Sequence, residues 1–222
     1  NVKKAGMKKG KNKEFSTPYT VTNAVAKGNI ITKLSLLIMG LGNIAHKQIG
    51  KGIMFLAVEA AYIWYMIQSG IYNLSMLPSL GWREQEKVWN EKKSIYEYTA
   101  GDQSALILLY GVATVYITAM FIIVWRESVK SSYKSEVLAK SGKHLNNFKE
   151  DCKSLLDQNL YKLLLAAPVM GILIFTILPL IYNITMAFTN YSKVNDHLVL
   201  FDWVGLANFK KTLNFGDSIG KQ

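Results

Sequence analysis

Residues 163–188 read LLLAAPVMGILIFTILPLIYNITMAF, and this stretch decides the fold. It belongs to an uncharged run that is bounded by Lys162 and Lys193. A helix rises about 1.5 Å per residue and needs roughly 20 apolar residues to cross the hydrocarbon core of a membrane. The stretch is therefore long enough to span a membrane, and tilt or a kink would absorb the excess length.

The same stretch carries residues that a simple lipid anchor does not need. Pro168 and Pro179 are kink sites, and their spacing of eleven positions places them on nearly the same helix face. Gly171 would let a second helix approach closely, and Asn183 could hydrogen-bond across such a contact. These residues favour a span packed inside a helix bundle, and a plain anchor is the open alternative.

Two further apolar runs predict spans at 52–69 and 103–125. Glu59 lies within the first of them, where an ionised side chain costs about 2.5–3.5 kcal/mol on insertion scales. We therefore expect Glu59 to face protein, to be paired or to stay neutral. It would form part of a polar pathway or a tie between helices, or it would be an acid tolerated near the bundle surface.

The distribution of charge predicts how the chain is threaded through the membrane. The chain is 50% hydrophobic with a net charge of +11, and its 26 basic residues gather in segments beside the apolar runs. Basic residues number ten, four, eight and four in residues 1–51, 70–102, 126–162 and 189–222. Because cytoplasmic loops carry the excess of Lys and Arg, this alternation predicts a cytoplasmic N-terminus and an external first loop. Nucleic-acid binding is not indicated.

The fold class expected from these patterns is an all-α integral membrane helical bundle with three transmembrane helices and additional interfacial amphipathic helices. For residues 30–51 an interfacial amphipathic segment fits best, and a re-entrant hairpin is the alternative. The expected segments are a disordered basic cytoplasmic arm (1–29), the amphipathic segment (30–51), three spans (52–69, 103–125 and 163–188), an external loop (70–102), a cytoplasmic loop with an amphipathic helix (126–162) and an external segment (189–222).

The sequence offers no catalytic, cofactor-binding or metal site. His46, His144 and His197 are far apart, and Cys152 is the single cysteine, so no metal-ligand spacing is present. No phosphate-binding loop and no nucleophile elbow occur either. We expect no cofactor and no enzymatic activity in this chain.

Several positions in the third predicted span and the tail carry a family resemblance. They are LLAAP (164–168), Gly171, Phe175, PLIY (179–182), AFTNY (187–191), Phe201, WVGL (203–206) and NF (208–209). This pattern resembles the permeases of carbohydrate ABC importers, and most closely the maltose/maltodextrin, MalF-like type in its shorter Gram-positive form. The strong match covers about 163–210, whereas residues 30–125 match mainly in their layout of spans.

The resemblance implies a subunit that imports oligosaccharides such as maltodextrins across the cell membrane of a Gram-positive bacterium. It implies a second permease subunit, an ABC ATPase dimer that hydrolyses ATP, and an external solute-binding protein as partners. The chain would be an N-terminal fragment in which 189–222 begins a truncated permease core. The family's sugar site and ATPase-docking loop would then follow residue 222, so no substrate-binding residue is carried over. A membrane-anchored assembly or signalling protein is the alternative function.

Overall fold

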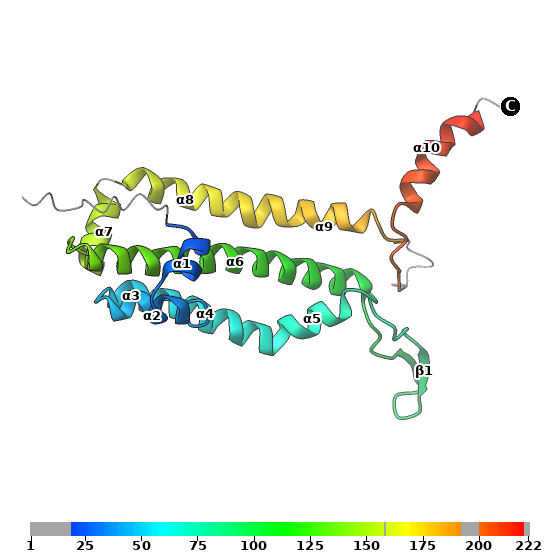
Figure 1. Ribbon diagram of the computed structural model, residues 1–222. Helices are drawn as coiled ribbons and strands as arrows, with labels where there is room; N and C mark the ends of the chain where they lie inside the picture. The colour runs from blue at the N-terminus through cyan, green and yellow to red at the C-terminus, as the bar shows by residue number, and fades with distance from the viewer. Residues whose placement is uncertain (1–18, 158, 192–199, 220–222) are drawn as a thin grey trace, which may run out of the picture.

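The computed structural model describes residues 19–157, 159–191 and 200–219. Three helical stretches in these residues are long and apolar enough to cross a membrane: Ile49–Met76, Ser104–Lys140 and Leu160–Met186. Figure 1 shows them running along a common long axis. The prediction of a helical bundle with three membrane-spanning helices is confirmed, and the sheet in the described ranges is one two-stranded hairpin.

The three long stretches are assembled from shorter elements, because π-helical turns (η) interrupt the first and third. The bounds in chain order are α1 Val21–Lys27, α2 Ile30–Leu34, α3 Leu41–Ala45, α4 Ile49–Tyr65, η1 Met66–Gly70, α5 Ile71–Met76, β1 Lys87–Asn90, β2 Ile95–Tyr98, α6 Ser104–Lys140, α7 Phe148–Leu156, α8 Leu160–Ile172, η2 Leu173–Ile177, α9 Leu178–Met186 and α10 Ala207–Ile219.

The third span contains both prolines and one π-helical turn. Pro168 lies inside α8, and Pro179 lies in the first turn of α9, directly after η2. Because Pro179 has no N–H, the carbonyl of Phe175 loses its α-helical partner, and the wider turn η2 lies at this point. The local helix geometry therefore follows from the position of the proline.

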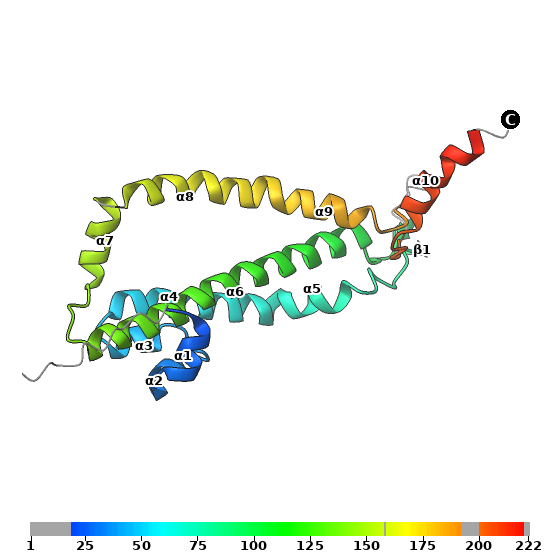
Figure 2. The ribbon, with the colours of Figure 1, turned by 45° about the horizontal axis from the view of Figure 1, so that its top comes forward.

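The third span packs on α6 at one end only. Leu178, Tyr182 and Met186 of α9 contact a buried cluster that includes Leu108 of α6. These three residues are partly buried, and no residue of α8 or α9 is fully buried. Figure 2 shows the third span meeting α6 at α9 and diverging from it along α8. Most of the surface of α8 is therefore free of contacts within this chain.

The second span is one continuous helix that runs 15 residues past its predicted end at Trp125. No glycine or proline occurs between 126 and 140, so nothing in the sequence breaks α6 there. Its 37 residues correspond to about 56 Å, compared with a hydrocarbon core of about 30 Å. The first part of the expected loop 126–162 is thus a helical extension of the span. The rest contains α7, whose first turn is closed by a capping box between Asn147 and Glu150.

Residues 19–48, which we call the N-terminal segment, fold back against the extension of α6. They form α1, α2 and α3 and not the single amphipathic helix expected for 30–51. The backbone turns at Gly40, whose φ of 78° is left-handed, and again at Lys47, whose φ is 66°. Thr32 and Asn43 are fully buried. A membrane-surface helix would keep such polar side chains in water, so the segment is part of the packed protein.

The structure also changes the description of the basic arm 1–29. Its last part forms α1, which is capped by the Thr20 side chain and buries Ala24 against Val129 and Tyr133 of α6. Residues 1–18 lie outside the described residues. The positions from 21 to 27 are therefore helical and not disordered as expected.

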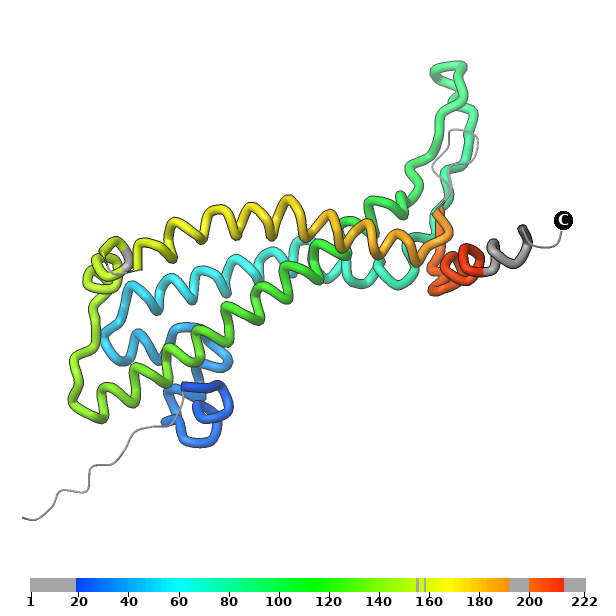
Figure 3. The backbone as a smooth tube through the Cα atoms, turned by 90° about the horizontal axis from the view of Figure 1, so that it is seen from above, coloured from blue at the N-terminus to red at the C-terminus, as the bar shows by residue number. Residues whose placement is uncertain are grey.

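The opposite end of the bundle, which we call the hairpin end, carries the hairpin β1–β2 and the tail helix α10 (Figure 3). Phe201 from the tail is buried with Leu80, Leu108 and Val112, and this cluster joins the loops to the spans. Residues Thr189 and Trp203 form an isolated antiparallel bridge. The segment that follows the third span thus closes over this end of the helices.

Candidate functional site

The extension of α6 holds a buried carboxylate. The side chain of Glu136 is 3% exposed, and its two oxygens accept hydrogen bonds from the backbone N–H of Asn29 at 3.1 and 2.9 Å. The Thr32 hydroxyl donates to the same carboxylate at 2.6 Å, and the Lys140 ammonium is its ion-pair partner. A buried charge is stable only when it is paired and hydrogen-bonded, and both conditions are met here. Glu136 therefore fixes the start of α2 to α6.

A second buried polar group joins α3 to the same face of α6. The Asn43 amide donates to Gln48 and to Ser131, each at 2.9 Å, and its oxygen accepts from the Ser132 hydroxyl at 2.9 Å. The Ser135 hydroxyl donates to the Gln48 oxygen at 2.7 Å. Every buried side-chain nitrogen or oxygen among the described residues has a hydrogen-bond partner. The network is fully satisfied, which makes it rigid and specific in its geometry.

Glu59 connects the first span to the turn between α2 and α3. Its carboxylate accepts a hydrogen bond from the backbone N–H of Met39 at 2.8 Å, and the next N–H, of Gly40, donates to Ser128 of α6 at 3.1 Å. Glu59 is half-buried on α4. The acid in the span thus has a backbone donor, and one turn is held by α4 and α6 together.

Polar side chains also join the first two spans toward their middle. The Tyr62 hydroxyl donates to Thr118 at 3.1 Å, and the Tyr65 hydroxyl lies 2.8 Å from the Thr114 oxygen. The ring of Tyr62 stacks on that of Phe121 with centroids 3.9 Å apart and planes at 7°. Hydrogen bonds between membrane helices stabilise their association by about 0.6 kcal/mol each on average. These contacts align α4 with α6.

The predicted residues of the third span are not brought together with Glu59. Pro168, Pro179 and Asn183 are exposed, and a side chain added at Gly171 would meet nothing within 4 Å. One hydrogen bond reaches the span near its middle, from the Tyr116 hydroxyl of α6 to the carbonyl of Leu173 at 3.1 Å. The five residues singled out in the sequence therefore lie on two separate surfaces.

Sequence reasoning missed Glu136 and Asn43, two polar residues that the structure buries. A signal was present in the serines at 128, 131, 132 and 135, whose spacing of three and four places them on one face of a helix. That pattern indicates a polar contact surface on α6, but it does not name the partner segment.

The described ranges hold no group of three His, Cys, Asp or Glu side chains arranged for a metal ion. Outside the spans, Asp102 and Glu150 are among the carboxylates whose pKa is lowered. That of Asp102 is lowered by hydrogen bonds from the N–H groups of Trp82 and Arg83, and that of Glu150 by the N–H of Asn147 and by His144. Both contacts close loops or helix ends. The polar groups of this chain position helices.

Comparison with known proteins shows that the chain is similar in sequence to sugar-transport permeases. The chain is 26% identical over 195 residues to the maltodextrin transport system permease protein MdxF of Bacillus subtilis (strain 168), an alignment that covers 86% of this chain and 40% of that protein. It is 25% identical over 186 residues to the galactooligosaccharides transport system permease protein GanP of the same organism, covering 81% and 40%. The chain is a homologue of sugar-transport permeases.

A third permease of this kind is the maltodextrin transport system permease protein MalC of Streptococcus pneumoniae serotype 4. It is 27% identical over 177 residues, which cover 78% of this chain and 37% of MalC. The chain thus spans about 40% of the length of the curated relatives that it matches. No family model and no solved structure matches it.

Proposed function

We propose that this chain belongs to a membrane-spanning permease subunit of an ATP-binding-cassette importer for oligosaccharides, with maltodextrin-like sugars as the substrate class. The observation that carries the proposal is the alignment over most of the chain with permeases named for maltodextrin and galactooligosaccharide transport. The three membrane-spanning helices support it, because a permease must be an integral membrane protein.

In the proposed orientation the N-terminal segment and α7 face the cytoplasm, and the hairpin end faces outward. The alternation of basic residues along the sequence supports this threading. The packed polar face of α6 then lies on the cytoplasmic side, where water and lipid headgroups can accommodate the charges of Lys140 and Arg126.

The proposed partners are a second permease subunit, an ABC ATPase dimer, and an external solute-binding protein. The second permease would complete the translocation pathway. The surface of α8 supports such a contact, because its apolar side chains are exposed and Gly171 leaves open space beside the helix. The ATPase would supply the free energy, and the permease itself would be no enzyme.

Deletion of the gene in its host tests the function. We expect the deletion strain to lose uptake of one oligosaccharide and to keep monosaccharide uptake. Complementation with the gene should restore the oligosaccharide uptake. The purified whole protein should co-isolate with an ATPase. If the uptake of every oligosaccharide tested is unchanged and no ATPase co-purifies, the proposal is refuted in favour of a membrane-anchored assembly or signalling protein.

A further inference from the structure

The hairpin β1–β2 has two chemically different faces. Its antiparallel register pairs Lys87 with Tyr98 and Trp89 with Tyr96. Because successive residues of a strand point to opposite sides, these four side chains share one side of the hairpin, which we call the aromatic face. The other side carries Val88, Asn90, Ile95 and Glu97.

The two faces differ in the kind of contacts that their side chains make. On the second side, Glu97 accepts hydrogen bonds from Asn90 at 2.8 Å and from Lys93 at 2.7 Å. On the aromatic face, the ring of Trp89 meets that of Tyr96 edge-on at 4.9 Å, and the Lys87 ammonium lies 4.9 Å from the centre of the Tyr96 ring. Trp89, Tyr96 and Tyr98 are 48%, 60% and 49% exposed, and on the second side Val88 and Ile95 are 48% and 50% exposed. The aromatic face is distinguished by its rings and its lysine.

A two-stranded hairpin of this kind is marginally stable in water by itself. Its base is fixed, because Asp102 accepts hydrogen bonds from the N–H groups of Trp82 and Arg83 at 3.0 Å, and Thr99 donates its N–H to Glu86 at 2.9 Å. Beyond this base, the extensive contacts of each strand in the described part of the chain are with the other strand. The exposed aromatic area is therefore available for contact with a surface outside the hairpin.

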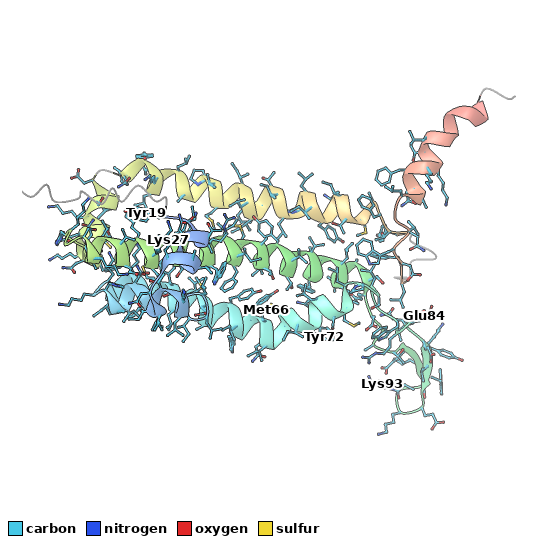
Figure 4. All side chains as sticks on the ribbon, viewed as in Figure 1. Tyr19, Lys27, Met66, Tyr72, Glu84 and Lys93 are labelled. Atoms are coloured by element: carbon cyan, nitrogen blue, oxygen red, sulfur yellow. The ribbon has the colours of Figure 1, made fainter. Side chains whose placement is uncertain are left out.

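The position of the hairpin identifies that surface. Figures 1 and 3 show it at the end of the three spans, extending across their long axis and not along it. In Figure 4, Tyr72 lies on α5, Glu84 lies on the irregular segment that leads to the hairpin, and Lys93 lies toward the tip. An element that leaves the bundle sideways at this level runs parallel to the membrane plane. At the same end of the bundle, Ile71 and Tyr72 of α5 are 61% and 59% exposed.

We propose that the aromatic face binds the headgroup region of the bilayer beside the spans, so that the hairpin is an interfacial membrane anchor. Trp and Tyr concentrate at membrane–water interfaces because one part of each ring is apolar and another can hydrogen-bond. A lysine beside them keeps its ammonium among the headgroups while its stem follows the apolar surface. The anchor would fix the rotation of the first two spans about the membrane normal. The inference rests on the three spans and not on the transported substrate.

Electron paramagnetic resonance on the whole protein tests this assignment with two adjacent positions. Nitroxides are attached to Lys87→Cys, on the aromatic face, and to Val88→Cys, on the other face, in a Cys152→Ser background. The protein is reconstituted into vesicles of phosphatidylethanolamine and phosphatidylglycerol. Relaxation is then measured with oxygen, which partitions into the bilayer, and with a nickel chelate, which stays in water.

We expect the ratio of oxygen to nickel accessibility to be higher at position 87 than at position 88. Adding Trp89→Ser and Tyr96→Ser to the Lys87→Cys chain should lower the ratio at 87 to that at 88. Equal ratios at both positions, or a higher ratio at 88, would overturn the proposal. An immobilised label at 87 that neither reagent reaches would overturn it as well, since that result indicates a protein partner on the aromatic face.

Discussion

Removal of the Glu136 carboxylate should release the start of the N-terminal segment from α6. In Glu136→Ala, the hydroxyl of Thr32, a residue with 0% exposure, loses its acceptor. Leaving one buried polar group unsatisfied costs about 1–3 kcal/mol, and losing the hydrogen bond from the N–H of Asn29, an exposed residue that water can reach, adds about 1 kcal/mol. We therefore expect a local destabilisation of about 2–4 kcal/mol.

Hydrogen exchange measured by mass spectrometry in lipid nanodiscs reports this change directly. The relevant amides include those of Lys33 and Ser35, which donate to Asn29 and Ile31 within α2. Local opening governs their exchange, so about 2–4 kcal/mol corresponds to an acceleration of roughly 30- to 1,000-fold. Glu136→Gln keeps the size and one acceptor oxygen, and its exchange should lie between those of the wild type and the alanine variant.

Glu127→Ala is the matched control on the same helix. Glu127 also pairs with a lysine, Lys130 at 2.6 Å, but its side chain is 60% exposed. An exposed pair of this type contributes about 0.2–1 kcal/mol, so exchange in α2 should change little. If the α2 amides exchange at the same rate in Glu136→Ala and Glu127→Ala, the buried carboxylate does not hold the N-terminal segment and our reasoning is refuted.

Four further predictions use other features of the chain. Cys152 should resist a membrane-impermeant thiol reagent in intact cells and react after permeabilisation; labelling from outside would refute the cytoplasmic placement of α7. Glu59→Gln should be mild and Glu59→Lys severe in assembly and transport, because Met39 donates to the carboxylate at 2.8 Å, and a normal lysine variant would contradict this. Gly42→Ala should lower the melting temperature, since its new methyl carbon would lie 2.7 Å from Ser132, whereas Gly171→Ala has open space and should not. Asp102 has a lowered pKa in the fold, so its contribution to stability is complete above its unfolded pKa and is lost as pH falls through the folded value. Hydrogen exchange of the Trp82 amide should therefore accelerate below about pH 4. In Asp102→Asn this exchange should be insensitive to pH in that range, once intrinsic rates are subtracted.

The sequence predicted the three spans because the membrane imposes a length and a hydropathy that each span must meet alone. It could not predict that α6 continues past Trp125, because Arg126, Glu127 and Lys130 have the composition of a loop at a membrane surface. Helical periodicity describes one face of a helix and not the segment that covers it. The residues Thr32 and Glu136 are 104 positions apart, and no local pattern joins them.

The glycines of the N-terminal segment illustrate the same limit. In the sequence Gly40 interrupts an apolar pattern, and Gly52 begins the first predicted span. In the structure they are close-approach positions, because a methyl carbon at Gly40 would lie 2.3 Å from the carbonyl oxygen of Gly52. A glycine required by a long-range contact is indistinguishable in one sequence from a glycine at a turn. The sequence therefore did not indicate that this segment packs against two spans.

The polar contacts join some of the described helices more firmly than others. From Glu136 to Tyr65, hydrogen bonds and a ring stack join the N-terminal segment, α4 and α6 at successive levels. Directional contacts at several levels oppose both rotation and sliding, so we infer that these elements move as one unit. The third span is attached through α9, the tail and one hydrogen bond to Leu173, while α8 makes no buried contact in this chain. Its α8 half can therefore pack on another helix without disturbing the first two spans, which is the freedom that a transporter bundle needs when its helices rearrange.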